Sequence, residues 1–545
     1  MRFVHGRPCL SRNGQPRFPL ARWLAIALAA AVMDARPLHA LRAQEPTAAG
    51  IDGRQFQQGA PPAYWEPRNQ FPVMGHQYTA FQPGPAPPPV PTPESPLDRA
   101  VRELQPSEPS QESPLDRAVR ELGVAPETAG APPAAAPSGP APTGPAPGGG
   151  AQLKLMDISL DGLFAAGTST ERDPSLQELE GGGHDPRKRG FTVRGVEVSM
   201  MGAVDPYLDG EMHLVNFIDP IQGDTVVELE EAFMTTRSLP KGLQLKAGQF
   251  LTEFGRINPT HPHAWAWLDQ PIINTRVFGP DGMRAPGVRL SRLLPVHWFS
   301  QVYVTMQNAN GEQMASFLAN EEFFAERPIG GRPFVYRDVR SLGDLTYTVR
   351  WENSWTTCCE EVTWLLGQSA AFGPNATGLH GKTQIVGLDL TRKWKPAKNE
   401  RGWPFTIWMG EFILRRYQAD TFFGPDPANP ETNLVLPSEM LTDWGFYTQY
   451  LYGFKPKWAV GLRYEYAWGA NYSLNQDFVP ISRNEDPFRD DRHRFSPLVA
   501  WYLTEFSRFN LQYNFDYAQH LPTKNAHSFW LGAEFGLGSH PAHKF

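Results

Sequence analysis

The chain has 545 residues and a formal net charge of -7 at pH 7, which excludes the strongly basic balance of many nucleic-acid-binding proteins. No run of about 20 apolar residues occurs, so we expect no membrane-spanning helix. Of the three cysteines, Cys358 and Cys359 are adjacent. Neighbouring cysteines seldom satisfy disulfide geometry, so the composition excludes a disulfide framework.

The first 43 residues have the pattern of a secretory signal peptide. Five arginines between Arg2 and Arg22 precede the apolar run 23–33, and small residues near Ala40 or Ala43 suit cleavage. A run of eleven apolar residues is too short to cross a bilayer. A buried core helix is the alternative interpretation. We expect residues 1–43 to be a removable signal peptide.

Residues 44–150 are rich in Pro, Ala, Gly, Ser and Gln, and such a segment cannot bury enough apolar surface to offset its ordering entropy. This composition predicts a disordered periplasmic tether. It contains one 11-residue sequence twice, at 94–104 and 112–122. In each copy the second and third residues are Ser-Pro, a plausible N-cap and first helical position, and three apolar residues follow along one helical stripe. A helix this short has marginal stability on its own. The repeat could therefore serve self-association or docking to a cell-envelope protein, or it could be a duplication without function.

From residue 151 to 545 the dominant pattern is alternation with a period of two, clearest between Trp458 and Trp468. Large apolar residues at even positions alternate with Ala, Gly, Arg and Glu at odd positions. In a strand these two rows face opposite sides. A strand of about ten residues, tilted by about 45°, spans roughly 23 Å, close to the ~25 Å apolar band of a membrane barrel. Trp458 and Trp468 are predicted to lie in its two aromatic girdles.

The same alternation recurs in segments such as 156–164, 345–352 and 508–517. Outer rows of Tyr, Trp and Phe beside inner rows of Arg, Glu and Asn favour a membrane barrel over a soluble sandwich. Sixteen candidate strands begin near residues 153, 190, 207, 225, 242, 285, 297, 343, 360, 381, 404, 441, 457, 493, 506 and 526. The segments 361–370 and 405–416 alternate poorly. The sequence therefore predicts an all-β fold, a transmembrane antiparallel up-and-down β-barrel of about 16 strands with a disordered N-terminal segment.

Connection lengths support this count. Short connections at 205–206, 238–241, 294–296, 356–359, 454–457 and 504–505 alternate with long ones at 165–189, 252–284, 309–342, 418–440 and 469–492. Bacterial barrels have short periplasmic turns and longer external loops. The connection 395–403 is long for a periplasmic turn.

The external loop 252–284 is rich in Trp, Phe and Ile, which an exposed flexible loop would not tolerate, so it is expected to pack inside the barrel. Here the chain resembles trimeric outer-membrane porins, whose third loop narrows the pore, and 243–255 resembles the matching segment of phosphate-selective and related porins. The resemblance implies a homotrimer in the bacterial outer membrane that lets small hydrophilic solutes or ions diffuse passively.

Charges on this loop and on inward strand positions are the candidate pore residues. We predict Arg256, Arg276, Arg284 and Asp269 at the constriction. The predicted pore wall comprises Arg194, Lys246, Arg350, Glu352, Arg463, Glu465 and Arg508. The signs are mixed, whereas a phosphate-selective channel would be expected to have a dominant basic ladder.

His261, His263 and Asp269 form a metal-like cluster, because imidazole and carboxylate ligands suit zinc. The His-Pro-His loop faintly resembles zinc-regulated outer-membrane receptors. Pro262 interrupts regular geometry, and the sequence supplies no evident fourth ligand. We predict a zinc site at His261 and His263, with ordinary hydrogen bonding as the alternative.

Enzyme motifs are missing: the sequence has neither His-Glu-x-x-His nor Gly-x-Ser-x-Gly. We expect no enzyme activity, no cofactor and no nucleic-acid partner. The expected partners are the lipid bilayer, small hydrophilic solutes, two further copies of the chain and a cell-envelope protein for the tether. The alternatives to a porin are a receptor or transporter for a metal ion or metal complex, and a non-transporting barrel anchor or adhesin.

Overall fold

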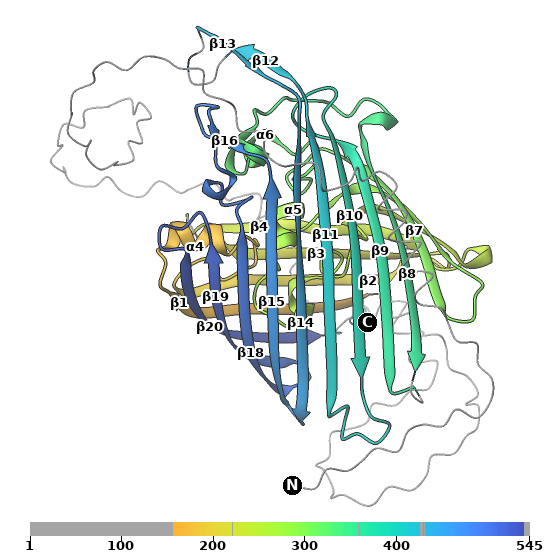
Figure 1. Ribbon diagram of the computed structural model, residues 1–545. Coiled ribbons are helices and arrows are strands. Elements are labelled where there is room, and N and C mark those ends of the chain that lie inside the picture. Colours follow the sequence, from red (N-terminus) through yellow and green to blue (C-terminus); the bar gives the residue numbers. More distant parts are fainter. Residues whose placement is uncertain (1–155, 221, 358–359, 426–428, 430, 539–545) are drawn as a thin grey trace, which may run out of the picture. The chain divides into compact units, whose positions relative to one another are not determined.

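The computed structural model describes residues 156–538 except 221, 358–359, 426–428 and 430. The predicted signal peptide (1–43) and tether (44–150) lie outside the described residues, as do Cys358 and Cys359. Within the described part, sixteen antiparallel strands form a closed barrel, and the last strand pairs with the first (Figure 1). The predicted fold class is therefore confirmed.

The wall strands are β1 (Asp157–Ser169), β2 (Gly190–Ala203), β3 (Leu208–Ile218), β4 (Thr225–Thr236), β5 (Leu243–Leu251), β6 (Arg284–Leu293), β7 (Phe299–Asn308), β8 (Leu345–Thr357), β9 (Val362–Pro374), β10 (Lys382–Trp394), β11 (Phe405–Ala419), β14 (Glu439–Lys455), β15 (Trp458–Ala470), β18 (Arg492–Thr504), β19 (Ser507–Ala518) and β20 (Asn525–Gly538). The poorly alternating segments are β9 and β11, because inward apolar residues such as Leu365 and Ile413 interrupt the polar row.

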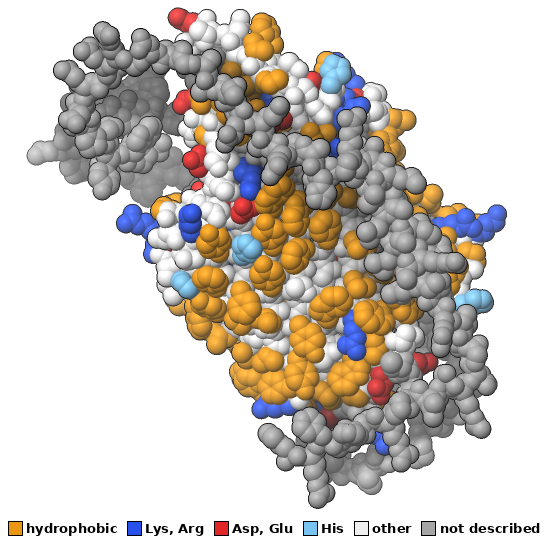
Figure 2. Space-filling view, viewed as in Figure 1, with side chains coloured by type: hydrophobic (Ala, Val, Ile, Leu, Met, Phe, Trp, Pro, Cys, Tyr) orange, Lys and Arg blue, Asp and Glu red, His pale blue; other side chains and the backbone are white. Residues whose placement is uncertain are grey.

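The outer face of the barrel is apolar and its inner face is charged. Figure 2 shows aromatic and aliphatic side chains covering the strands between two more polar ends. On β15, Val460 and Leu462 are exposed, whereas the next residue, Arg463, is buried inside the barrel. Closure leaves no strand of the barrel at an open edge, so neighbouring strands rather than water can satisfy the backbone polar groups. This arrangement is expected of a protein that is surrounded by lipid.

None of the helices among the described residues has the length and hydropathy needed to cross a bilayer.

The connections differ in length at the two barrel ends. Those at the end that holds the strand termini Asp157 and Gly538 are mostly short, and we call it the turn end. The opposite end carries the long connections 170–189, 252–283, 309–344, 420–438 and 471–491. Most expected loop boundaries are displaced by one or two residues; for example, Arg284 opens β6. The largest difference is at β1, which continues to Ser169, so the first loop begins at 170 rather than 165.

The long connections contain the remaining regular elements. These are α4 (Asp173–Leu179), α5 (Ile272–Phe278), α6 (Glu321–Glu326), the hairpins β12 (Phe422–Pro425) with β13 (Asn433–Leu436) and β16 (Ser473–Leu474) with β17 (Pro480–Ile481), and the 3-10 turns η2 (Pro262–Ala264), η3 (Ile329–Gly331), η4 (Leu342–Asp344) and η5 (Arg483–Glu485). The turn η1 (Pro240–Gly242) joins β4 to β5. We call the connection 252–283, with η2 and α5, the inner loop.

Candidate functional site: the inner loop and the lumen

The inner loop lies inside the barrel and is bonded to the opposite wall. The amide of Ile272 donates to Oε2 of Glu465 on β15 at 2.6 Å. The indole of Trp267 donates to the carbonyl of Ser496 on β18 at 3.0 Å, and the amide of Leu268 donates to Gln512 on β19 at 2.8 Å. The loop therefore crosses the lumen rather than extending into the external medium.

Apolar side chains of the inner loop pack against glycines of the wall. A Cβ atom placed on these glycines would come within 3.0 Å of a loop side chain, which is closer than real Cβ contacts. The four pairs are Gly387 with Phe254, Gly445 with Ile273, Gly461 with Trp267, and Gly532 with Leu268. Glycine inside a strand often marks such a close approach. These wall glycines act as sockets for the loop.

Asp269 anchors the loop through charge. Its carboxylate forms ion pairs with Arg463 of β15 and Arg494 of β18, and it accepts a hydrogen bond from Gln512 at 2.6 Å. Burial raises the pKa of Asp269, but the positive charges of Arg463 and Arg494 outweigh it and hold that pKa below its ordinary value. The buried carboxylate is thus kept ionised and compensated.

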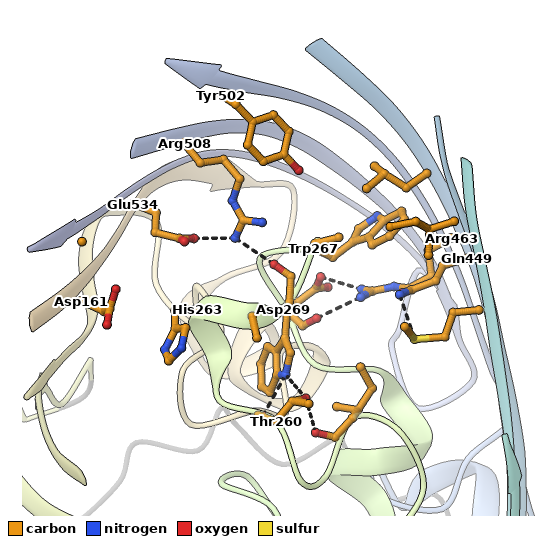
Figure 3. Close-up of a pocket in the computed structure, with 18 of the residues that line it drawn as sticks. Asp161, Thr260, His263, Trp267, Asp269, Gln449, Arg463, Tyr502, Arg508 and Glu534 are labelled. Atoms are coloured by element: carbon orange, nitrogen blue, oxygen red, sulfur yellow. Dashed lines mark hydrogen bonds and ion pairs between the residues drawn. The ribbon is translucent and has the colours of Figure 1, made fainter. Parts of the chain in front are cut away.

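Between the inner loop and the turn end of the barrel lies a cavity of ≈ 330 Å³ (Figure 3). The loop contributes Trp265 and Trp267 to its lining, and the turn between β18 and β19 contributes Glu505. Charged residues of both signs line the cavity: Asp161, Arg256, Asp269, Lys393, Arg463, Glu505, Arg508 and Glu534. This is a polar, charged space between the loop and the wall.

The four predicted constriction residues occupy two kinds of position. Arg256 and Asp269 line the cavity. Arg276 is buried and pairs with Asp490, and Arg284 pairs with Glu228 and Glu230 of β4. Neither of these two arginines lines the cavity. The assignment of all four residues to a constriction stays a prediction.

The predicted wall residues are all in strands, and several bind the loop. Arg194 of β2 donates to the carbonyl of Leu268. Arg194 is three residues from inward-facing Glu197, so strict alternation would place the two on opposite faces. A β-bulge at Arg194, where Leu163 pairs with Gly195 and Phe164 with Val193, turns both inward.

The other predicted wall residues pair across the inner face. Arg350 binds Asp389 at 2.7 Å and Glu352 at 3.2 Å. Arg463 binds Glu465 at 2.7 Å, and Arg508 pairs with Glu534. The ammonium of Lys246 lies 3.5 Å from the ring centre of Phe233. Their role in conduction stays a prediction.

The predicted girdle residues lie at the two ends of β15. Trp458 stacks on Trp501 of β18, with ring centres 5.9 Å apart. Trp468 packs against Trp444 of β14 at 6.0 Å, and the guanidinium of Arg483 lies 4.9 Å from its ring centre. The assignment to interfacial girdles stays a prediction.

The two loop histidines meet a group of wall residues that the sequence pattern did not reveal. We call the set Glu197, His213, Glu230, Glu231, His261 and His263 the histidine cluster. His261 lies 3.0 Å from Glu230 and 2.8 Å from Glu231, and His263 lies 3.1 Å from Glu197. Asp269, which the sequence grouped with these histidines, is held instead by arginines on the opposite wall.

Burial lowers the pKa of His261, but the negative charges of Glu230 and Glu197 outweigh burial and hold that pKa well above its ordinary value. The cluster therefore attracts positive charge. The sequence offered two weak signals for it: the adjacent carboxylates Glu230-Glu231 inside a strand, and a histidine, His213, in the inner row of β3.

A closed sixteen-strand barrel with an apolar exterior, a charged interior and a long loop folded into its lumen is the architecture of a bacterial outer-membrane porin. The protein is a transmembrane β-barrel of the bacterial outer membrane.

No protein-family model matches the chain. An uncharacterized protein of Aquifex aeolicus (strain VF5) is 28% identical over 419 residues, which cover 72% of this chain and 80% of the relative.

Solved structures with a similar fold include the outer-membrane channel DcaP of Acinetobacter baumannii, with 10% identity and a TM-score of 0.44 over 70% of this chain and 98% of that one. The anion-selective porin from Comamonas acidovorans has 9% identity and a TM-score of 0.41 over 70% of this chain and 100% of that one. At these values the likeness carries no argument about function.

Proposed function

We propose that the protein is a porin that lets small hydrophilic solutes or ions diffuse passively across the outer membrane, through a lumen narrowed by the inner loop. The cavity of ≈ 330 Å³ between the loop and the turn end, lined by charges of both signs, carries this proposal. A polar lining substitutes for hydration and lets charged or hydrogen-bonding solutes enter.

Ion pairs already satisfy much of the lining, which limits its selectivity. Arg463 pairs with Asp269, and Arg508 pairs with Glu534. The guanidinium of Arg256 has no ion-pair partner among the described residues, and Lys393 lines the same cavity. Asp161 and Glu505 add negative charge to the same lining, so acidic and basic residues are balanced and we expect only a weak charge preference.

The test is single-channel recording in planar bilayers with the purified full-length protein. Steady ohmic steps, with a reversal potential close to zero in asymmetric KCl, are the expected result. Liposome swelling with sugars of increasing size would measure the exclusion limit. A folded, inserted protein without conductance would contradict the proposal and favour the non-transporting anchor.

We further propose a homotrimer. A solved OmpT structure of Vibrio cholerae is described as a trimer form, and the exterior of this barrel offers exposed aromatic side chains over several strands (Figure 2). Light scattering of the detergent-solubilised protein, corrected for bound detergent, should give the mass of three chains. The mass of one chain would contradict this assembly.

A further inference from the structure

The histidine cluster brings three imidazoles to one carboxylate. Oε1 of Glu197, on β2, lies 2.8 Å from Nδ1 of His213 on β3. Oε2 of the same side chain lies 3.2 Å from Nδ1 of His261 and 3.1 Å from Nδ1 of His263 on the inner loop. Ligand atoms of Glu197, His213 and His261 all lie within 4.8 Å of one another.

These spacings are near those of atoms that share a metal ion. Two donors bound tetrahedrally to one zinc ion, each at about 2.0–2.1 Å, lie roughly 3.3 Å apart. Nδ1 of His261 approaches Oε2 of Glu230 to 3.0 Å, yet both atoms are buried and have no hydrogen-bond partner. Buried polar atoms normally have one. Close approach without hydrogen-bond alignment is expected of ligands that point at a common ion.

A β-bulge supplies an additional carboxylate at this place. His213 of β3 pairs with Glu231 of β4, but the next residue, Leu214, pairs with Leu229. Glu230 is therefore the extra residue, and both Glu230 and Glu231 face inward, with exposed fractions of 3% and 6%. A bulge interrupts the strand ladder and can redirect a side chain. Here it concentrates negative charge around His261.

The charge balance of the surroundings favours a cation. Four carboxylates face the histidines: Glu197, Glu211, Glu230 and Glu231. The nearby cations are Lys246, whose charge acts on Glu231, and Arg284, which lies 3.4 Å from Glu230 and also pairs with Glu228. With neutral imidazoles the carboxylates outnumber these cations by two. Buried charge of one sign is costly unless it is compensated, and a divalent ion would compensate it.

The histidine cluster borders the main cavity at His263. A void of ≈ 10 Å³, about the size of one water, is bounded by Glu197, His263 and Asp161. His263 and Asp161 also line the cavity of ≈ 330 Å³. The cluster is thus adjacent to the solvent space of the lumen, although its own side chains are largely buried.

We propose that the histidine cluster binds one divalent transition-metal ion of the Zn²⁺ type, with Glu197, His213 and His261 as ligands and His263 or Glu230 completing the coordination. Nitrogen and carboxylate ligands suit Zn²⁺ and its neighbours, whereas Ca²⁺ and Mg²⁺ require oxygen ligands. Two ligands come from the wall and at least one from the inner loop. The ion therefore fastens the loop to β2 and β3, whether or not the barrel conducts.

The test is metal binding by the full-length protein, without a polyhistidine tag, in detergent after treatment with a chelator. Isothermal titration with Zn²⁺ should give one site per chain that Mg²⁺ does not occupy. Co²⁺ should produce visible absorption bands typical of four-coordinate nitrogen and oxygen ligation. His261→Ala and His213→Ala should each weaken Zn²⁺ binding by more than about tenfold, since loss of even an outer partner of a metal ligand costs that much.

His380→Ala is the matched control, because the side chain of His380 is 88% exposed in an external loop; it should leave the site intact. Glu197→Gln, which keeps the shape of the side chain, tests the same site if a histidine variant fails to fold. The proposal would be overturned if both histidine variants bound Zn²⁺ with the same affinity as the wild type. A titration that shows no one-to-one Zn²⁺ site would also overturn it. The cluster would then be a set of ion pairs between protonated histidines and carboxylates.

Discussion

At the scale of single residues, charged side chains that are buried from bulk water organise the lumen. The carboxylate of Asp269 is fully compensated by two arginines and two amides, from Gln512 and Asn514. Removing one member of such a group is costly because its partners stay buried without compensation. The ion pairs of Asp269 therefore help to fix the inner loop in place.

Asp269→Asn tests this role. The amide keeps the size of the side chain but leaves Arg463 and Arg494 without their shared charge, so the free energy of unfolding should fall by about 3–5 kcal/mol. Guanidinium titration in lipid micelles, followed by Trp fluorescence, measures it. Asp338→Asn is the control, because Asp338 pairs with Arg340 at the surface, where a solvent-exposed ion pair contributes little to stability. Equal losses in both variants would contradict the anchor role.

The same carboxylate predicts a direction for the pH dependence of stability. Because the pKa of Asp269 is lower in the folded than in the unfolded protein, its contribution is fully present above the unfolded pKa of about 3.9 and is lost as the pH falls toward the folded value. The difference in unfolding free energy between wild type and Asp269→Asn should therefore be constant from pH 7 to about pH 5 and shrink below about pH 4. A difference that grows on acidification would be inconsistent with the ion pairs.

Arg256 is the residue through which charge selectivity can be tested. Arg256→Glu reverses one charge in the cavity, so the reversal potential in asymmetric KCl should shift toward cation preference while the channel stays open. Arg340→Glu makes the same change at a side chain that is 81% exposed and lies in an external connection. If the reversal potential shifted equally in both variants, the charge selectivity would not arise from Arg256 in the lumen.

At the scale of elements, the inner loop and the barrel wall fit each other by size. Large loop side chains meet glycines on β10, β14, β15 and β20, and the apolar cluster formed by Phe254, Ile273 and Phe278 includes the wall residues Ile385 and Ile413. A wall with full-sized side chains at these positions would have no room for the loop. The wall and the loop therefore form one packing unit.

Trp267→Ala should enlarge the passage. The indole fills the space beside Gly461 and Leu498 and lines the cavity, so its removal should raise single-channel conductance and cost about 3–5 kcal/mol of stability. Trp408→Ala is the matched control, because Trp408 lies on the outer row of β11, four residues before exposed Phe412. Unchanged conductance in Trp267→Ala would mean that the loop does not limit the current.

Gly461→Val tests the socket itself. The new Cβ would lie 2.9 Å from the ring of Trp267, and such overpacking should lower the free energy of unfolding by about 1–3 kcal/mol. Gly410→Val places the same side chain on the outer row of β11, next to Glu411 of the inner row. The Gly461 variant should be clearly less stable than the Gly410 variant, as measured by the temperature at which the folded band disappears on gels. Equal stability would remove the argument for a socket.

At the scale of the whole molecule, the strands that the structure describes as closing the barrel all follow the predicted tether. All sixteen strands lie between Asp157 and Gly538, and β20 closes the barrel on β1. A mature chain shortened to 151–545 should therefore insert into bilayers with the conductance of the full-length protein. Bilayer recording of both forms measures this. Failure of the short form to fold would show that the preceding segment takes part in the barrel.

The sequence predicts those features of the fold and the site that depend on local interactions along the chain. The alternation of β15 identified a strand, its lipid-facing row and the inward position of Arg463, because the faces of a strand are set by the covalent chain alone. Strand ends were less certain, as at Ser169, since pairing with β20 prolongs β1 beyond its alternating part. Glu197, His213 and Glu230 were missed as partners of His261, because they come from three different strands.

The amino-acid sequence by itself determined the class of the fold, the number of strands and the end of the barrel that carries the long loops, since these depend on a period of two residues and on connection lengths. Only the tertiary structure decided which charged side chains form ion pairs with one another. The bulges at Arg194 and Glu230 shift the register of inward side chains, and the path of the inner loop brings Asp269 to the arginines and His261 to the glutamates. Contacts across a lumen join residues far apart in the chain, and no local pattern encodes them.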